Sequence, residues 1–411
     1  MKKSLVAIAA LAATGAFAQS SVTLSGVMDV GAVYRSNTAP GLNKVGLDRL
    51  NNNRLIFSGV EDLGGGLAAT FAAQMRFEPT SGTNEGGSAG YVGTGLTAGP
   101  GVVIPAVFPA CSTSVGRDGN GNCLSGPGLA FGRPLFQGET RVGLRGGFGA
   151  IRLGRGLTAL QAPNSVAIDP WVVTTVASSV YAPGYSTDYV AGGDGRTDGI
   201  FYDTPNFSGL SASFTYSPRK VNTLSKPFTS FAVNYNNGPI VAIAGYEQNR
   251  YGDSLTNVGG NYNLGVAKIY LGYGGVKGGD ATLRNGVAYL SGSAGMPGYG
   301  NGAPVLGGMT KFGQTTANIA AGTKIDAFSV GATAPFGPAK VLFGFSSYKS
   351  NIVGAQRDSK IGLGVNYALS KRTSVYSDIA STTRKNNLAG ANPANNNDRI
   401  TQMDLGIAHS F

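Results

Sequence analysis

Side chains that commonly act as catalysts are scarce in this chain of 411 residues, which contains one histidine and two cysteines. Hydrolases need a nucleophile or an activated water together with a general base, which is usually histidine. His409 is the only such candidate, and in TQMDLGIAHSF it shares its parity with the apolar Met403, Leu405 and Ile407. No triad-like context, metal-ligand cluster or phosphate-binding glycine loop accompanies it. The sequence therefore predicts a protein that is not an enzyme, with no catalytic residue, cofactor or metal.

Arginine offers a different chemistry, because it recurs on the polar parity of segments in which apolar and polar residues alternate. In LAATFAAQMRF, Arg76 shares the parity of Gln74, whereas Phe71 and Met75 occupy the other parity. Three more arginines alternate with apolar residues in the same way: Arg54, Arg141 and Arg152. A row of fixed guanidinium charges raises the local concentration of anions. What this charge can do depends on the elements that position it.

Alternation with a period of two extends over most of the sequence and is typical of strands with one apolar and one polar face. In VTLSGVMDVGAVY, for example, Val22, Leu24 and Met28 alternate with Thr23 and Ser25. About sixteen segments have this pattern, and they lie near 22–34, 54–62, 67–77, 133–146, 149–157, 199–204, 209–217, 229–236, 239–249, 255–264, 267–274, 324–334, 339–347, 359–369, 373–382 and 400–411. Tight turns between them alternate with mostly longer connections, which include 78–132, 158–198 and 275–323.

The composition indicates where such strands can be stable. Charged residues make up 13% of the chain, about half the usual share of soluble domains, and there is one tryptophan. The apolar strand faces have no tryptophan- or leucine-rich partner, but lipid can cover them while the polar faces line water. Every backbone group in lipid must be paired, so the sheet has to close. The sequence thus predicts an all-β fold, a 16-stranded antiparallel transmembrane β-barrel.

The first 18 residues resemble a secretory signal peptide. Lys2 and Lys3 precede an apolar run, and Ala16-Phe17-Ala18 supplies small residues for cleavage before Gln19. Without these two lysines, the 32 basic residues become 30 against 21 acidic ones, a charge of about +9. Export makes nucleic acid an improbable partner of this charge and leaves small anions and anionic lipid. We therefore expect a signal peptide at 1–18 and a barrel at 19–411.

A family resemblance rests on motifs that follow one another along the chain: SSVTLSGVMDVGAVY, NRLIFSGVEDLGGGLAATFAAQMRFE, FGRPLFQGETRVGLRGGFGAIRLGRG, YDTPNFSGLSASFTYS, YALSKRTSVYS and the final GIAHSF. Together they resemble the general porins of the Gram-negative outer membrane, which are trimeric sixteen-stranded barrels. The resemblance implies a homotrimer surrounded by outer-membrane lipid and lipopolysaccharide. It also implies a water-filled channel for passive diffusion of small hydrophilic solutes and ions.

General porins narrow their channel with a third loop that folds into the barrel, and here that loop is 158–198. The resemblance implies a constriction with arginines on the wall and carboxylates on this loop. Arg54 in NRLIFSG and Arg141 in ETRVGL match wall arginines, Arg196 is a looser match, and alternation adds Arg76 and Arg152. The loop supplies four candidate carboxylates: Asp169, Asp188, Asp194 and Asp198. The sequence departs from the family at Phe201, where many relatives carry an arginine, and it lacks a PEFGG-like loop tip.

An excess of arginine in the lumen would favour anions over cations. Two other functions are compatible with a barrel. A substrate-specific channel would have a dedicated site in 158–198, and a structural or adhesin barrel would need no conductance. The hydrolase alternative fails because its one possible base, His409, is expected to face lipid as an interfacial or subunit-contact ring.

Two further expectations concern assembly. Cys111 and Cys123 lie in the long second loop, about 78–132, and in an oxidising compartment they are expected to form a disulfide, with two free thiols as the alternative. In relatives the second loop latches onto a neighbouring subunit, so this disulfide could stiffen the latch. By the same resemblance, the final Phe411 looks like the signal that the barrel-assembly machinery reads.

Overall fold

The computed structural model describes most strands and turns of the chain and parts of its longer connections. The described residues are 21–36, 44–48, 53–77, 79, 135–136, 138–172, 175–178, 196–218, 226–248, 252–278, 322, 324–351, 357–385 and 399–411. The predicted signal peptide, Cys111, Cys123, Asp188 and Asp194 lie outside them. Within the described residues, no helix is long and apolar enough to cross a membrane.

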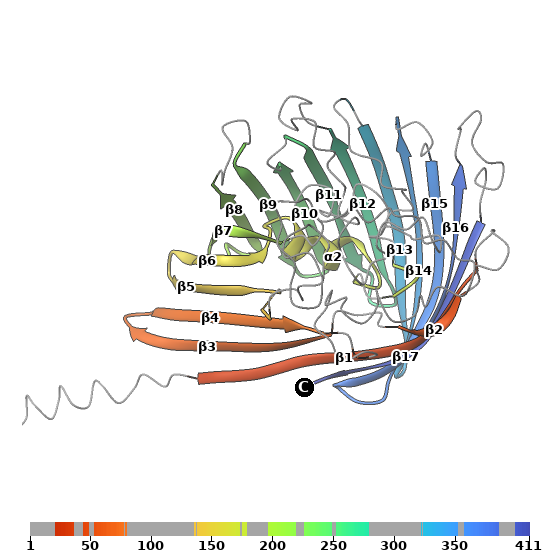
Figure 1. Ribbon diagram of the computed structural model, residues 1–411, viewed down its shortest axis with the longest axis horizontal. Coiled ribbons are helices and arrows are strands. Elements are labelled where there is room, and N and C mark those ends of the chain that lie inside the picture. Colours follow the sequence, from red (N-terminus) through yellow and green to blue (C-terminus); the bar gives the residue numbers. More distant parts are fainter. Residues whose placement is uncertain are drawn as a thin grey trace, which may run out of the picture.

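The described residues form one antiparallel sheet and the helix α2 (Gln161–Ile168). The strands are β1 (Ser21–Arg35), β2 (Lys44–Asp48), β3 (Arg54–Gly64), β4 (Leu67–Arg76), β5 (Thr140–Gly146), β6 (Gly149–Leu157), β7 (Arg196–Asp203), β8 (Leu210–Ser217), β9 (Phe228–Asn237), β10 (Ile240–Gln248), β11 (Ser254–Asn263), β12 (Lys268–Lys277), β13 (Lys324–Phe336), β14 (Ala339–Ser350), β15 (Arg357–Ala368), β16 (Thr373–Lys385) and β17 (Arg399–Ser410). Figure 1 shows them following one another around the wall.

The sheet closes on itself, because β1 pairs with β17 on one side and with β2 and β3 on the other. β2 and β3 run in the same direction beside β1, so these two segments share one position in the wall. The 17 strands therefore occupy sixteen positions. Asn53 lies at the break between β2 and β3, where its side-chain amide donates to the Asp29 carbonyl at 3.0 Å and its side-chain oxygen accepts from the Asp29 amide. This side chain replaces the missing rungs of the ladder, and the predicted closed 16-stranded barrel is confirmed.

The largest differences from the expected strands are in two places, and several other strands begin or end up to three residues from the expected positions, among them β7, which begins at Arg196. The segment Lys44–Asp48 was expected to belong to a connection, but it forms β2 against the second half of β1. β5 begins at Thr140 and not near residue 133, because Leu135 and Phe136 form a turn and Gly138 precedes the strand. Short turns connect the strands at one end of the wall. In the turn between β3 and β4, Gly64, Gly65 and Gly66 all have positive φ, which residues with a Cβ rarely adopt.

The two faces of the wall have opposite character. Side chains on the outward face are apolar and exposed, as in Leu24 (56%), Val142 (60%) and Leu271 (60%). Polar side chains on the inward face are buried, as in Asp29 (2%) and Gln74 (6%). Soluble proteins show the reverse arrangement, whereas a barrel in lipid has apolar residues outside and polar residues inside. The alternation predicted from the sequence thus corresponds to the two faces of the wall.

Candidate functional site: an arginine wall and the loop segment inside the barrel

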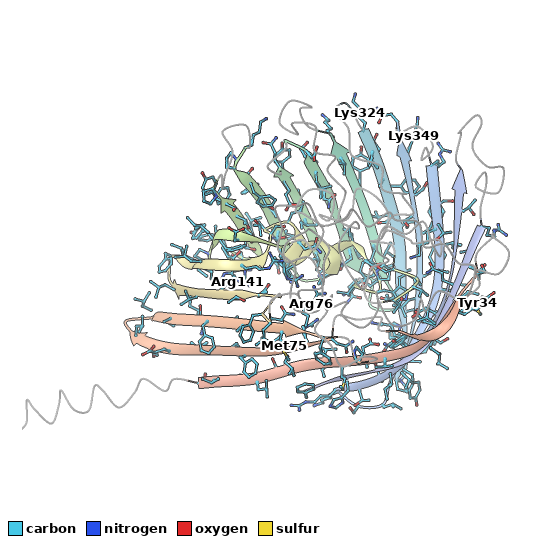
Figure 2. The ribbon with its side chains drawn as sticks, in the orientation of Figure 1. Tyr34, Met75, Arg76, Arg141, Lys324 and Lys349 are labelled. Atoms are coloured by element: carbon cyan, nitrogen blue, oxygen red, sulfur yellow. The ribbon has the colours of Figure 1, made fainter. Side chains whose placement is uncertain are left out.

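The inward face of β3 to β6 carries four of the arginines predicted from the sequence, and we call Arg54, Arg76, Arg141 and Arg152 the arginine wall. Arg54 on β3 and Arg76 on β4 are direct partners in the register. Directly paired residues in an antiparallel sheet project from the same face with Cα atoms about 4.5 to 5.5 Å apart. Arg76 is 4% exposed, and Figure 2 labels it on β4 and Arg141 on the neighbouring β5. The register therefore brings two like charges together, an arrangement that costs stability unless anions or solvent compensate for it.

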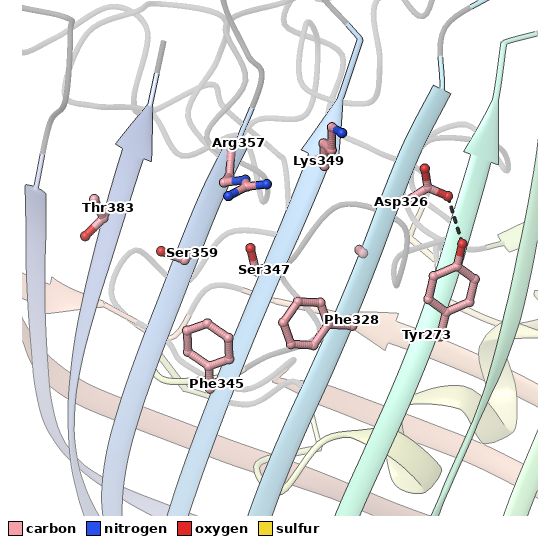
Figure 3. A pocket seen from close by; sticks show the side chains of 10 residues that line it. Tyr273, Asp326, Phe328, Phe345, Ser347, Lys349, Arg357, Ser359 and Thr383 are labelled. Carbon is pink, nitrogen blue, oxygen red and sulfur yellow. Dashed lines mark hydrogen bonds between the residues drawn. The ribbon is translucent and has the colours of Figure 1, made fainter.

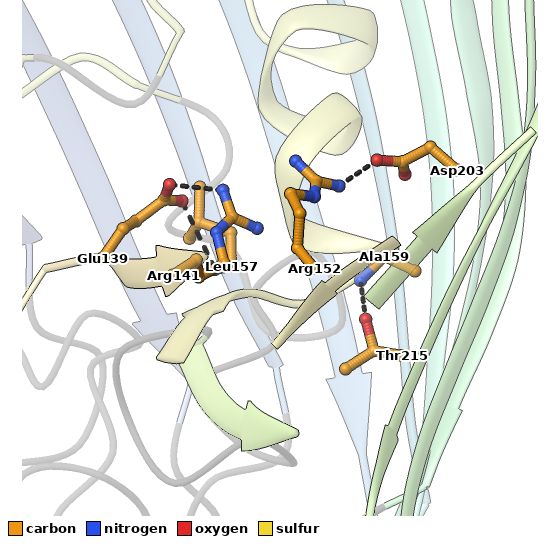
Figure 4. A network of polar contacts seen from close by, with 7 residues as sticks. All are labelled: Glu139, Arg141, Arg152, Leu157, Ala159, Asp203 and Thr215. Carbon is orange, nitrogen blue, oxygen red and sulfur yellow. Dashed lines mark hydrogen bonds and ion pairs between the residues drawn. The ribbon is translucent and has the colours of Figure 1, made fainter. Parts of the chain in front are cut away.

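Arg141 extends this row to the next strands. Its guanidinium forms an ion pair with Glu139, whose other carboxylate oxygen accepts from the Leu157 amide at 3.5 Å (Figure 4). The same guanidinium lies over the Phe201 ring, with 5.2 Å from Cζ to the ring centroid. On the intervening strand β6, a Cβ at Gly156 would stand 2.7 Å from Nη1 of Arg141. A glycine at this position lets the arginine cross β6 and stack on the aromatic ring of β7.

Arg152 lies nearer the short turns and forms an ion pair with Asp203 (Figure 4). Its partners in the register are Gly143 and Phe201. Arg152 is therefore paired with a carboxylate near the short turns, and its charge is less available to ions in the lumen than that of an unpaired arginine would be. Arg196 begins β7 on the parity of Ile200, whose side chain is exposed on the outward face, and not on the parity of Phe201. The register thus separates Arg196 from the arginine wall, and its side chain is buried.

The described part of the predicted third loop, residues 158–172 and 175–178, lies against the inward face of the barrel on other strands. α2 contacts β10 to β13, and Figure 1 shows it inside the curve of the sheet. Leu160 and Ile168 pack into an apolar cluster on this face that includes Ile243, Leu255 and Val276. Each buried Leu or Ile side chain contributes about 1.5 to 3 kcal/mol. These contacts hold the start of the segment on the wall.

Inward-facing glycines make room for the rest of the segment. A Cβ at Gly331 would stand 2.4 Å from Pro170, and one at Gly344 would stand 2.5 Å from the Trp171 ring. A Cβ at Gly362 would stand 2.8 Å from that of Ala177. Since carbon atoms pack about 3.5 to 4.0 Å apart, larger residues at these positions would push the segment away from the wall.

Hydrogen bonds to the last strands fix the end of the described segment. The Trp171 Nε1 donates to Asp378 at 2.5 Å, and the Val176 amide donates to Asp404 at 3.0 Å. Asp378 and Asp404 are themselves direct partners across β16 and β17. The Lys360 ammonium donates to the Ser178 carbonyl at 2.8 Å. Two neighbouring carboxylates and one lysine of the wall therefore bind the segment from Trp171 to Ser178.

Asp169 is the one predicted loop carboxylate inside this segment, and it is fully buried. It accepts a hydrogen bond from the Ser178 hydroxyl, and its neighbours Ile168 and Pro170 rest on β11 and β13. Asp198 belongs to β7, where it is the direct partner of Arg155. The structure therefore places Asp169 on the loop-bearing strands, away from β3 to β6 in the order of the sheet.

Several residues of the site were not selected from the sequence. Glu139 could have been found by its spacing, because it stands two residues before Arg141 and shares its parity. Asp378 also lies on a polar parity, but nothing in the sequence indicates that it binds Trp171, 207 residues away. His409 behaves as expected of an interfacial ring: it is exposed, stacks on Phe411 with ring centroids 6.4 Å apart, and lies 2.9 Å from the Thr373 hydroxyl.

Comparison with known proteins agrees with this architecture. The family model for Gram-negative porins matches residues 4–387. Outer membrane porin protein 32 of Delftia acidovorans is 29% identical over 445 residues, with 100% of each chain covered.

Solved structures show the same fold. The anion-selective porin from Comamonas acidovorans superposes with a TM-score of 0.63 at 22% identity, over 96% of this chain and 100% of that one. A trimer form of OmpT from Vibrio cholerae gives a TM-score of 0.54 at 12% identity, over 95% and 99%. With a closed barrel whose faces suit lipid outside and water inside, and a family match over nearly all of its length, this chain belongs to the Gram-negative porins and is an outer-membrane channel, not an enzyme.

Proposed function

We propose that this porin is a general diffusion channel that prefers anions, and that the arginine wall forms one side of its constriction. The observation that carries the proposal is the direct pairing of Arg54 with Arg76 on the inward face, with Arg141 on the neighbouring strand β5, where it is the partner of Ala72. Such a row maintains a positive potential over a narrow column of water. Anions passing along it would be stabilised, and cations would be repelled.

The other side of the constriction would be the loop 158–198. In this proposal its carboxylates, among them Asp169, Asp188 and Asp194, lie across the lumen from the arginines. Opposed rows of charge produce a transverse field, which orients dipolar solutes without binding any one of them tightly. Arg152 and Arg196 would contribute less, because Arg152 is paired with Asp203 and Arg196 starts its strand on the other parity.

Reversal potentials across a salt gradient in planar bilayers test this proposal. Replacing both Arg54 and Arg76 by glutamine removes two charges while keeping long polar side chains. Two unit charges 4 Å apart in water interact by about 1 kcal/mol, so an ion passing at that distance would lose about fivefold in preference per arginine removed. Arg372→Gln is the matched control, because Arg372 is exposed in the short turn between β15 and β16.

The result expected is anion preference in the wild type, a marked fall in the double variant and no change in the control. Cation selectivity of the wild type would refute the proposal. Block of the conductance by one solute at micromolar concentration would instead favour a substrate-specific channel. A protein that inserts but shows no conductance would favour a structural or adhesin barrel.

The assembled form would be a homotrimer, as in the trimer form of the OmpT structure. In the homotrimer proposed for this chain, the second loop would contact a neighbouring subunit, and a disulfide between Cys111 and Cys123 would stiffen that contact. Heating unreduced protein and comparing the dissociation temperature with that of a variant carrying serine at both cysteines tests this role. Equal temperatures would exclude it.

Phe411 would act as the signal for the barrel-assembly machinery after removal of the signal peptide at 1–18. In the barrel, the Gly26 amide donates to the Phe411 carbonyl at 2.9 Å and the Phe411 amide donates to Gly26 at 3.1 Å. The ring covers Gly26, where a Cβ would stand 2.5 Å from Cζ. Deletion of Phe411 should lower the amount of folded barrel in cells and leave the conductance of inserted channels nearly unchanged. Normal amounts would argue against this role.

A further inference from the structure

One carboxylate, Glu139, lies among the arginines of the wall and not on the third loop. It directly precedes β5 and shares the inward parity of Arg141. Its carbonyl accepts a hydrogen bond from the Gln74 amide at 2.7 Å, and the Gly138 amide donates to the Gln74 carbonyl at 3.1 Å. These two bonds continue the ladder between β4 and β5 past its last direct partners. The backbone of Glu139 is therefore fixed beside the inward face of β4.

The Glu139 carboxylate is engaged from two directions (Figure 4). One oxygen forms the ion pair with Arg141, and the other accepts from the amide of Leu157, the last residue of β6, at 3.5 Å. The side chains of Arg141 and Glu139 are only 12% and 18% exposed. Ion pairs between fully exposed side chains hold their partners weakly. This pair is largely shielded from water, so it fixes the positions of both charged groups.

The charge of Glu139 acts on more than its direct partner. It attracts Arg54 and Arg152 electrostatically, in addition to Arg141. Asp203, in contrast, forms its ion pair with Arg152 nearer the short turns. Three of the four members of the arginine wall therefore share Glu139 as a counter-charge.

A carboxylate in this place has two effects on the water column. Fixed charges beside a narrow column raise the concentration of ions of opposite sign, so Glu139 opposes the effect of the arginines on anions. Its bond also keeps the Arg141 guanidinium over the Phe201 ring, with 5.2 Å from Cζ to the ring centroid. An arginine that lies against the wall leaves more of the lumen open than one that extends into it.

We propose that Glu139 sets the selectivity of this channel, because it limits the anion preference that the arginine wall produces and positions Arg141 against the wall. The inference rests on the proposed function in requiring a conducting channel with the arginine wall along its lumen. The family resemblance implies carboxylates on the third loop, whereas this carboxylate belongs to the wall itself. Glu139 acts on passing ions by its own charge and acts on the shape of the lumen through Arg141.

Reversal potentials of the full-length protein in planar bilayers with a salt gradient test the proposal. Glu139→Gln removes the negative charge and keeps an oxygen that can accept from Arg141. We expect the anion preference to rise about twofold to fivefold, which is the effect of one unit charge 8 to 4 Å from an ion in water. Glu139→Ala removes the charge and the acceptor, so it should raise the preference and also make the single-channel current noisier.

Two control variants remove a carboxylate charge from the outward face. Glu61→Gln is the same substitution at an exposed residue of β3 on the parity of Phe57. Asp326→Asn changes a carboxylate that is engaged by a neighbouring strand, as Glu139 is, since it accepts from the Tyr273 hydroxyl at 2.8 Å (Figure 3). Both controls should keep the wild-type reversal potential and current noise.

A reversal potential that is unchanged in Glu139→Gln, or that moves toward cations, would overturn the proposal and leave Glu139 a structural role only. Equal current noise in Glu139→Ala and Glu139→Gln would overturn the positioning of Arg141. If Glu139→Gln yields no heat-resistant barrel, Arg141→Gln is compared with Glu139→Gln/Arg141→Gln, in which no arginine loses its partner at this pair. Loss of the carboxylate should again move the reversal potential toward anions, and no movement would overturn the proposal.

Failure of this inference can be told apart from failure of the proposed function. The sign of the wild-type reversal potential tests whether the channel prefers anions. The direction of the change in Glu139→Gln tests the role of Glu139, and it should be toward anions whichever ion the wild type prefers.

Discussion

The inward face of β3 to β6 and the inward face of β9 to β17 are two parts of one sheet, yet they differ in their charged side chains and in their contact with the described loop segment. The first carries the arginine wall, in which guanidinium groups are neighbours in the register or stack on Phe201. The second carries apolar residues, glycines and carboxylates, and the loop segment from Leu160 to Ser178 covers it. Loop contacts thus use hydrophobic packing, Asp378 and Asp404 as hydrogen-bond acceptors and Lys360 as a donor, whereas the arginine wall lies on other strands.

This difference shows how a period-two pattern can produce two different inner surfaces. Polar parity alone says only that a residue faces inward. On β5 and β6, long cations lie beside acidic partners, because Arg141 forms an ion pair with Glu139 and Arg152 with Asp203.

Where the loop segment covers the inward face, glycines and apolar residues make room for the segment. The buried Asp378, Asp404 and Lys360 each have a hydrogen-bond partner on the segment, because burying an uncompensated charge is costly. Each of the following changes tests one side of this division.

The largest effect on the loop should come from replacing an inward-facing glycine that contacts it. In Gly344→Val, the new Cβ would collide with the Trp171 ring, which lies 2.5 Å away. Overpacking costs about 1 to 3 kcal/mol, so the detached loop should become about tenfold to a hundredfold more populated. Trp171 is the one tryptophan of the chain, and its fluorescence should move to longer wavelength while single-channel current becomes noisier.

Gly275→Val is the matched control for this change. A Cβ at Gly275 would meet nothing closer than the Asp326 side chain at 3.7 Å. Its fluorescence and current should equal those of the wild type. If Gly344→Val leaves the tryptophan spectrum unaltered, close packing of the Trp171 ring on Gly344 does not hold the loop in place.

A smaller effect should follow the loss of one acceptor under the loop. Asp404→Ala removes the partner of the Val176 amide, and a buried donor without a partner costs about 1 to 3 kcal/mol. Relief of the repulsion between Asp404 and its direct neighbour Asp378 offsets about 0.2 to 1 kcal/mol of this loss. Hydrogen exchange at the Val176 amide should therefore accelerate.

The control for the acceptor is Asp326→Ala, which removes a carboxylate from the outward face. Hydrogen exchange at the Val176 amide should be the same in Asp326→Ala as in the wild type. If the Val176 amide exchanges equally slowly in the wild type and in Asp404→Ala, packing alone holds this part of the loop. Glycines and apolar residues would then be the features that distinguish the loop-bearing inner face from the arginine wall.

The smallest effect should appear on the arginine wall itself. Phe201→Leu keeps an apolar side chain but removes the ring beneath Arg141, a cation–π contact worth about 0.5 to 2 kcal/mol. Anion preference measured by reversal potential should change by less than in the variant that lacks Arg54 and Arg76. Phe214→Leu, on the outward face of β8, is the control. A loss as large as that of the double arginine variant would mean that Phe201 positions the whole wall.

Much of the architecture could be predicted from the sequence. Strand β6 has the predicted ends, Gly149 and Leu157, and the barrel, the family and the outer membrane location are confirmed. The short strand β2 was missed, because five residues next to an irregular stretch give too few alternations to detect. The constriction residues, the trimer, the disulfide, the signal peptide and the assembly signal remain predictions.

The sequence by itself determined which way each strand residue faces, because alternation has a period of two and lipid excludes charge from one face. That was enough to place Arg54, Arg76 and Arg141 on the inside. Only the tertiary structure decided which residues meet. The stacking of Arg141 on Phe201 depends on the register of three strands, and the bond from Trp171 to Asp378 joins residues 207 positions apart. Such contacts follow from how the closed sheet packs around the loop, and a local pattern carries no information about partners that distant.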